Sequence, residues 1–361
     1  MPRKRLNITD CIRRDIVRGT WKRGERLPDR RWFMERYKAY PTTVQRAFDD
    51  LSNEGFVTAV RGHGTQVAEV LPYDSRYLLL LDSGRSDPAS RPFSAAISQA
   101  AKEIEQRLGV VMDVRYVSHE HPESEVYQSI VANAKRHAYA GVFCEGVPHG
   151  EDGLSLANVN DVPIVFVGPK DEWSQGTMAF SLWDYAKRDP ADAVRTLFLE
   201  YCRDHGGRRI AVFQSSGSRI GRQPDPEHKY REVARRYGVE LVPFGYHNVE
   251  MSGFDVDQFE RLVGLFLASS AGANAETIIL ADDNLTMPFV RACRRKFGVK
   301  AASTRYNVLS HCNFPLLPDV RGFPVSFHGL DLCETLASVV EYTTDCRNRL
   351  KKPRLPKFVI K

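Results

Sequence analysis

Hydrophobic residues in the first fifth of the chain recur at the spacing of three short helices. The first pattern covers residues 8–17 and is preceded by Asn7, a residue type that caps helices. The second covers residues 30–37 and follows Asp29, whose carboxylate can accept from the free N–H groups of a helix start. The third begins at Pro41, because the fixed φ of proline suits the first helical turn. The N-terminal part is therefore expected to be a small helical unit.

The third helix has an apolar and a polar side, and a hairpin follows it. Its apolar residues recur at i, i+3, i+4 and i+7: Val44, Ala47, Phe48 and Leu51. The other side carries residues that form hydrogen bonds: Thr42, Thr43, Gln45 and Arg46. Two β-branched runs, residues 57–60 and 65–67, surround a basic glycine-rich tip and predict a hairpin. Two helices joined by a turn, the second polar at its start, suit contact with base edges in the major groove of DNA.

Strand-like and helix-like stretches alternate through the rest of the chain, beyond a linker at residues 71–76. Strands are expected at residues 77–81, 111–117, 140–144, 162–167, 209–213, 240–242, 277–280, 306–309 and 357–360. Helices are expected at residues 93–108, 125–137, 190–201, 229–237, 257–268, 288–297 and 331–342. This alternation predicts an α/β protein in which residues 77–361 form two lobes, each a doubly wound parallel sheet, behind an N-terminal domain of residues 1–70.

The net charge of the chain lies in its first 70 residues. These residues contain 15 Lys and Arg against 9 Asp and Glu, which accounts for the whole net charge of +6. The rest of the 361-residue chain is neutral overall. A small basic domain joined to a larger neutral one indicates a polyanion partner for the small domain.

Composition excludes several classes of protein. With 42% hydrophobic and 27% charged residues, the chain is expected to fold rather than to be disordered or fibrous. No apolar stretch approaches the roughly 20 residues of a bilayer crossing, and no secretory pattern follows the basic N-terminus, so we expect a cytoplasmic protein without a membrane partner. The seven cysteines occur singly, which favours reduced thiols over disulfides or a metal cluster.

The sequence motifs of common enzymes are missing. There is no G-x-G-x-x-G after a strand, no phosphate-binding P-loop, no G-x-S-x-G elbow and no H-E-x-x-H helix. The pair His119 and His121 fits a polar loop better than a pair of metal ligands. We therefore expect no catalytic residue, no metal site and no cofactor, and the chain is not expected to be an enzyme.

The N-terminal motifs resemble the winged helix-turn-helix of the GntR family of bacterial transcription regulators. The resemblance rests on residues 27–31, 42–47, 54–57 and 62–65 in unbroken register. It implies DNA contacts by Arg31, by the recognition helix at Thr42, Thr43, Gln45 and Arg46, and by the wing tip at Arg61, Gly62 and His63. Of these, His63 is equally well explained as a turn residue. The sequence departs from the common family pattern at Asp29, Lys38, Tyr40 and Pro41, which leaves the operator sequence open.

The remaining 290 residues resemble the sensor domain of the LacI family, which is related to periplasmic sugar-binding proteins. The resemblance rests on residues 91–94, 139–144, 162–167, 207–213, 279–283 and 355–360. It implies an effector site lined by Asp82, Ser83, Phe93, Trp183, Asp282 and Asn313, together with either Arg219 or Arg222. On chemical grounds, Phe327 could also pack on an apolar ring face of the ligand, as could Phe93 and Trp183. For each aromatic residue, core packing is an equally good explanation. The family usually has two aspartates where this chain has Cys312 and Asn313, so no known sugar can simply be transferred.

Together these features predict a transcription regulator, most simply a repressor. The N-terminal domain would bind a double-stranded DNA operator as a homodimer, and a small polar effector, a monosaccharide, would bind between the two lobes. Two alternatives remain open. The GntR-type domain could be fused to an enzyme-like domain, or the second domain could dimerise without binding a ligand.

Overall fold

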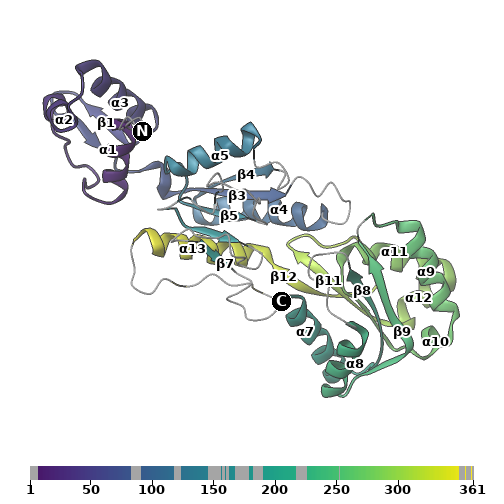
Figure 1. Cartoon of the computed structure of the whole chain (residues 1–361). Coiled ribbons are helices and arrows are strands. Elements are labelled where there is room, and N and C mark those ends of the chain that lie inside the picture. Colours follow the sequence, from purple (N-terminus) through teal and green to yellow (C-terminus); the bar gives the residue numbers. More distant parts are fainter. Residues whose placement is uncertain are drawn as a thin grey trace.

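The structure, a computed structural model, divides the chain into three bodies that lie in a row (Figure 1). It describes residues 7–82, 91–117, 123–144, 156, 159, 162–166, 179–181, 190–216, 226–251, 253–348, 354 and 359. An N-terminal domain is followed by two α/β lobes, each built on a five-stranded sheet whose described strand pairs are all parallel. The predicted α/β fold class with an N-terminal winged helix is confirmed. Within the described residues, no helix combines the length and the apolar character that a bilayer crossing requires.

The N-terminal domain packs three helices against a two-stranded antiparallel hairpin. Its elements are α1 (Ile8–Val17), α2 (Arg30–Tyr37), α3 (Pro41–Asn53), β1 (Val57–Val60) and β2 (Gly64–Val67). The side chain of Asn7 accepts the Thr9 N–H at 3.1 Å, and Asp29 accepts the Trp32 N–H at 2.9 Å, so both predicted caps are formed. The apolar sides of the helices share one buried cluster that includes Ile12, Phe33, Val44, Phe48 and Leu51.

A buried arginine joins the first and third helices of this domain. The Arg13 side chain is only 2% exposed. Its guanidinium is bonded to Glu54 just after α3, with Nε at 3.0 Å from Oε2, and it also pairs with Asp10 one turn earlier on α1. Because a buried charge is costly unless it is paired, these bonds fix the packing of α1 on α3.

Lobe one is built on a sheet with the strand order β4-β3-β5-β6-β7. The strands are β3 (Arg76–Asp82), β4 (Val111–Val117), β5 (Gly141–Cys144), β6 (Ile164–Phe166) and β7 (Ala179–Ser181). One face is covered by α4 (Arg91–Leu108) and by α13 (Leu332–Arg347), whose Leu336 and Val339 share a core with Leu79 and Leu81. The other face is covered by α5 (Glu125–Lys135) through Tyr127.

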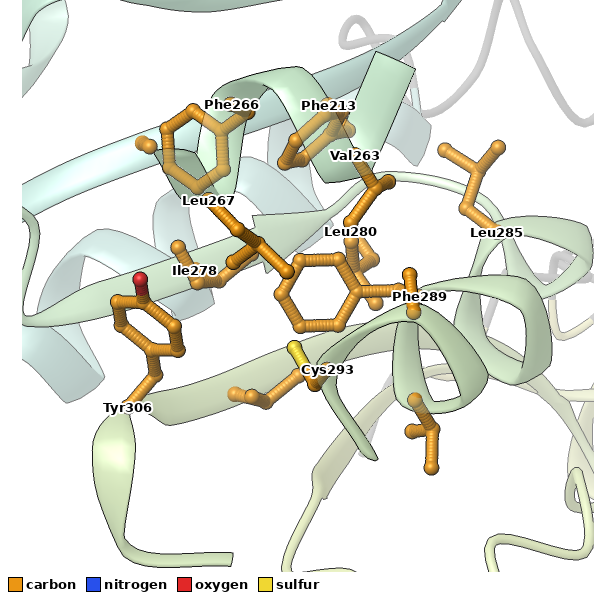
Figure 2. Packing of buried hydrophobic residues seen from close by; sticks show 14 of the residues in the cluster. Phe213, Val263, Phe266, Leu267, Ile278, Leu280, Leu285, Phe289, Cys293 and Tyr306 are labelled. Carbon is orange, nitrogen blue, oxygen red and sulfur yellow. The ribbon is translucent and has the colours of Figure 1, made fainter. Parts of the chain in front are cut away.

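Lobe two repeats this architecture with the strand order β12-β11-β10-β8-β9. The strands are β8 (Arg209–Ser216), β9 (Glu240–Glu250), β10 (Thr277–Leu280), β11 (Asn307–Phe314) and β12 (Ser326–Asp331). Helices cover both of its faces: α9 (Val256–Ala268) and α11 (Thr286–Phe297) are the main ones on one face, and α7 (Pro190–His205) and α8 (Pro226–Arg236) pack on the other. Figure 2 shows the first of these cores, where Phe213 of β8 lies close to Phe266 and Phe289.

Several elements differ from those expected from the sequence. The segments β7, β12, α10 (Ser270–Asn274) and α12 (Val299–Arg305) were not predicted. Strand β9 extends far beyond the expected residues 240–242, because the chain bulges at Phe244, which has a φ of +56°, and then pairs again with β8 from Tyr246. The helix expected at 125–137 ends at Lys135, since His137 adopts a φ of +58°.

Candidate functional site

The start of α3 presents a polar surface to solvent. Thr42, Thr43, Gln45 and Arg46 are all exposed, while Val44 between them is fully buried. This follows from the helical repeat, because positions 44, 47, 48 and 51 face the core and the positions between them face outward. Pro41 occupies the first turn, so its missing N–H removes no helical hydrogen bond. The four predicted recognition residues thus share one open helix face.

The tip of the hairpin, the wing, is equally open. Arg61, Gly62 and His63 are exposed, and Gly62 and Gly64 have φ values of +77° and +84°, which glycine adopts without strain. The Nδ1 atom of His63 lies 3.2 Å from the carbonyl oxygen of Arg61. This contact helps to shape the turn, and it leaves the other ring nitrogen available for a phosphate.

Arg30 connects the recognition helix to the wing, a role that the sequence did not suggest. Its guanidinium carbon lies 3.4 Å from the centre of the Phe48 ring, and its NH2 group donates to Thr65 Oγ1 at 3.2 Å. Its Nε lies 3.5 Å from Gln45 Oε1. Burial lowers the pKa of Arg30, opposed by the charge of Asp49. The neighbouring Arg31 is exposed and forms only a surface pair with Glu35, so it remains available to DNA.

A second group of polar side chains lies at the carboxyl edge of the sheet in lobe two. Asp282 and Asp283 follow β10, and His311 and Asn313 lie at the end of the neighbouring strand β11. The Asn313 amide donates to Asp283 Oδ2 at 3.0 Å. Adjacent strands in a sheet lie about 4.8 Å apart, so strand ends are where side chains from separate parts of the chain converge. We call these four residues the strand-end cluster.

Asp282 also serves as a helix cap. Its Oδ1 accepts the backbone N–H of Asn284 at 2.9 Å and the side-chain amide of Asn284 at 2.8 Å. The carboxylate thus begins the 3-10 turn Asp283–Leu285 that leads into α11. This capping role coexists with the position of Asp282 at the sheet edge.

The pKa values of the titratable groups in the strand-end cluster are shifted by burial. Burial, and next the charge of Asp283, raise the pKa of Asp282 to about 6. Burial also raises the pKa of Asp283, opposed by the Asn313 hydrogen bond. Burial lowers the pKa of His311, opposed by the carboxylate of Asp282. The cluster therefore combines two carboxyl groups, an imidazole whose neutral form is favoured and an amide, with no described lysine or arginine paired to either aspartate.

The other predicted effector residues are spread over the two lobes. Asp82 is the last residue of β3, beside Val117 of β4, and so lies at the carboxyl edge of the lobe-one sheet. Phe93 is half-buried on α4 and packs against the lobe-one core. Phe327 lies level with Ser310, three residues before the part of β12 that flanks Asn313. Ser83, Trp183, Arg219 and Arg222 lie outside the described residues.

Two members of the cluster were not predicted as site residues. Asp283 is the second residue of the Asp-Asp-Asn run after β10, and the sequence alone does not decide which of two consecutive carboxylates faces the next strand. His311 precedes Asn313 by two positions on β11, and this period-2 spacing puts both side chains on the same face of the sheet. That spacing was the available signal for His311.

The N-terminal domain matches a known protein family in sequence. Residues 4–67 match the family described as "Bacterial regulatory proteins, gntR family". No curated protein matches the chain in sequence. Among solved structures, a periplasmic ribose ABC transporter protein from Conexibacter woesei is similar, with a TM-score of 0.53 at 16% identity over 80% of this chain and 92% of that one.

Two further structures show the same fold. A solute-binding protein from Burkholderia graminis in complex with D-arabinose has a TM-score of 0.51 at 12% identity, covering 80% of this chain and 95% of its own. A regulatory protein of the LacI family from Chloroflexus aggregans has a TM-score of 0.50 at 13% identity, covering 78% and 96%. The N-terminal domain is therefore a GntR-family domain, and the two lobes have the fold of periplasmic binding proteins and LacI-type sensors. The chain is a DNA-binding transcription regulator.

Proposed function

We propose that the protein is an effector-controlled repressor in which a small, hydroxyl-rich molecule binds between the lobes and changes operator affinity. The strand-end cluster is the observation that carries this proposal. Its two carboxylates and the amide oxygen of Asn313 are hydrogen-bond acceptors, and that buried oxygen has no hydrogen-bond partner of normal geometry among the described residues. Buried acceptors that lack donors favour a ligand that supplies them.

The chemistry of the cluster narrows the class of effector. Sugar hydroxyls donate hydrogen bonds in fixed directions, which suits carboxylates and amides held at a sheet edge. Anionic ligands such as sugar acids or sugar phosphates would lie close to Asp282, whose pKa of about 6 leaves the carboxylate charged at neutral pH, and like charges repel strongly where water is excluded. A neutral pentose, hexose or polyol is therefore the preferred effector. The fold shared with the arabinose-bound solute-binding protein is consistent with this class.

Regulation would follow from linkage between the two sites. An effector that binds one arrangement of the lobes more tightly shifts the population toward it, and operator affinity changes by the same coupling energy, commonly about 1 to 3 kcal/mol. Operators of bacterial regulators are usually two-fold symmetric, so a homodimer would place two recognition helices on one operator in the cytoplasm. No chemical step is needed, and the effector would be released unchanged.

A thermal-shift panel of neutral pentoses, hexoses and polyols, with sugar acids and sugar phosphates as the anionic arm, tests this proposal. A neutral ligand should raise the melting temperature of the wild-type protein, and mass spectrometry should recover that ligand unchanged. Asp282→Ala should abolish the shift. Asp255→Ala is a matched control, because Asp255 caps α9 in the same way but is not part of the strand-end cluster. Stabilisation only by anionic ligands, or a shift that survives Asp282→Ala, would remove the cluster from the effector site.

A further inference from the structure

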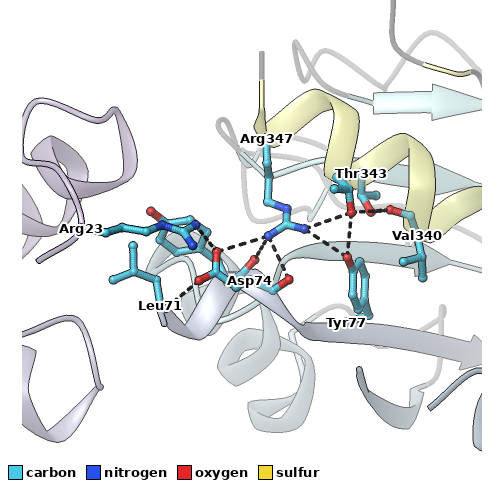
Figure 3. Close-up of polar contacts among 9 residues, drawn as sticks. Arg23, Leu71, Asp74, Tyr77, Val340, Thr343 and Arg347 are labelled. Atoms are coloured by element: carbon cyan, nitrogen blue, oxygen red, sulfur yellow. Dashed lines mark hydrogen bonds and ion pairs between the residues drawn. The ribbon is translucent and has the colours of Figure 1, made fainter. Parts of the chain in front are cut away.

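The N-terminal domain is held against lobe one by a polar joint centred on Asp74 and Arg347 (Figure 3). Asp74 ends the short 3-10 turn η1 (Pro72–Asp74) between the N-terminal domain and β3, and Arg347 is the last residue of α13. Their side chains are only 15% and 16% exposed. The two residues are far apart in the sequence, so their contact is a property of the tertiary structure.

Arg347 binds the polypeptide that joins the two domains. Its NH1 group donates to the main-chain oxygens of Tyr73 at 2.6 Å and Asp74 at 3.0 Å, and it lies 3.5 Å from Asp74 Oδ1. Its NH2 group donates to the hydroxyl groups of Tyr77 at 3.2 Å and Thr344 at 3.1 Å. Because the planar guanidinium offers its donors in a fixed fork, these contacts define one orientation of the connecting turn relative to α13.

Asp74 extends the joint into the N-terminal domain. Its Oδ1 accepts from Arg23, which lies in the loop between α1 and α2, and its Oδ2 accepts the Leu71 N–H at 2.6 Å. Leu71 is 3% exposed inside the core of the N-terminal domain, and the Tyr73 ring lies 6.1 Å from the Phe56 ring. One face of the turn therefore packs on the DNA-binding domain, and the other face is bonded to the sensor.

The helix that ends at Arg347 starts at the other lobe. Strand β12 belongs to the sheet of lobe two, and α13 follows it without an intervening residue and packs on lobe one. Its 16 residues span about 24 Å at the usual rise of 1.5 Å per residue. A change in the angle between the lobes must therefore act on the first residue of this helix, and the helix is long enough to carry that displacement to the joint.

We propose that Asp74 and Arg347 are positioning residues for DNA binding: they set the orientation of the DNA-binding domain on lobe one, and α13 alters that orientation when the lobes move. The first half of the proposal stands on the contacts above and needs no ligand. The second half rests on the proposed effector function. The contacts with bases and phosphates belong to α3 and the wing. The joint therefore determines the orientation of this DNA-contacting surface and not its sequence specificity.

Hydrogen exchange measured by mass spectrometry on the full-length protein tests the joint without DNA or effector. In the Arg347→Ala variant, amides of residues 70–77 should exchange at least tenfold faster than in the wild type, while peptides from α3 and the central part of β5 stay unchanged. Arg347→Lys should recover only part of the protection from exchange, because an ammonium group cannot donate to the main-chain oxygens and to the two hydroxyl groups in the fixed geometry of a guanidinium. Arg107→Ala is the matched control, since Arg107 pairs with Glu334 on the same helix away from the turn.

Operator affinity measures the positioning role directly. With an operator selected in vitro on the wild-type protein, Arg347→Ala and Arg23→Ala should each weaken binding to the full operator at least tenfold, and binding to a single half-site less than twofold. The two losses should not add in the double variant, because both substitutions disrupt the same joint. Arg107→Ala should bind as the wild type does.

Either of two results overturns the proposal: exchange of residues 70–77 in Arg347→Ala that equals the wild type, or equal losses on the full operator and the half-site. Should Arg347→Ala not fold, Arg23→Ala decides alone, because the Arg23 side chain is half exposed and supports no core. An effector that leaves the joint variants fully responsive would overturn the transmission by α13. If no effector is found, the proposed function fails. The hydrogen-exchange rates and the operator affinities of the variants still test the role of Asp74 and Arg347.

Discussion

Asn313, near the end of β11, donates its amide to Asp283, which follows β10, across 3.0 Å. This bond joins the end of β11 to the turn after β10, 30 residues apart in the sequence, and it fixes the side-chain amide so that its nitrogen faces Asp283. Asp282 beside it is held by Asn284. The strand-end cluster is thus ordered by its own hydrogen bonds, which is the property a binding site needs before a ligand arrives.

Replacing Asp282 by Asn should stabilise the ligand-free protein at pH 7 to 8. The pKa of Asp282 is raised from 3.8 to about 6, so the folded state prefers the protonated form, and the stability that this provides below pH 4 is lost as pH rises through about 6. Above that pH the uncharged amide avoids burying a carboxylate and still accepts the Asn284 N–H, a gain of about 1 to 3 kcal/mol. Urea unfolding at pH 4.5 and pH 7.5 measures it.

The Asp282 gain should shrink toward zero at pH 4.5, where the wild-type carboxyl is protonated. Asp255→Asn should instead lower the free energy of unfolding at pH 7.5. Hydrogen bonds from the Gln258 and Asp257 N–H groups lower the pKa of Asp255, so the charged cap is favourable there. A destabilised Asp282→Asn protein at pH 7.5 would show that its charge is compensated in the folded protein.

Gln45→Ala should weaken binding to the cognate operator by about 1 to 3 kcal/mol and binding to random DNA much less. The Gln45 side chain is exposed on α3, and its amide donates to Asp49 at 2.7 Å, which orients its remaining donor and acceptor for a base edge. Fluorescence anisotropy on both DNAs measures the difference. Arg46→Ala is the comparison variant. It should weaken binding to the operator and to random DNA alike, and if Arg46 binds one phosphate it should reduce the slope of log K against log salt by about 0.9. Equal losses for Gln45→Ala on the two DNAs would assign it a positioning role.

Gly141→Ala should destabilise lobe one by about 1 to 3 kcal/mol. A Cβ at position 141 would lie 2.5 Å from Thr343 Cγ2 and 2.8 Å from its Cβ, so α13 would have to move away from β5. Gly264→Ala is the control, because a Cβ there meets nothing within 4 Å and alanine is the better helix former, which should stabilise the protein by up to about 1 kcal/mol. Differential scanning calorimetry of the two variants should show opposite shifts, and a stabilised Gly141→Ala would mean that α13 packs less closely on β5.

The local patterns of the sequence were sufficient for the N-terminal domain and for most of both lobes. The caps Asn7 and Asp29 and the helix start at Pro41 all occur as expected, because each depends on neighbouring residues only. Strand β12 was missed because its sequence Ser-Phe-His-Gly-Leu-Asp lacks a β-branched run, and it is stabilised by its pairing with β11 and by contact with α7.

The binding and positioning sites were predictable only in part. Asp282 follows an apolar strand, a position that the fold class makes informative. The Asp283–Asn313 bond and the contacts of Arg347 with main-chain oxygens join residues distant in sequence, and no local pattern encodes such pairs. The role of Arg30 could not be predicted from the sequence either, since its stacking on Phe48 depends on how α2 crosses α3.

One chain is proposed to couple a GntR-type DNA-binding domain to a ligand site in the two lobes. Fluorescence anisotropy with the selected operator, with and without the ligand found by thermal shift, measures this coupling. Saturating ligand should change the operator dissociation constant by about 5- to 150-fold, and Asp282→Ala should remove this change while keeping the ligand-free affinity. A ligand that binds the wild-type protein and leaves its operator affinity unchanged would show that the two sites are not coupled.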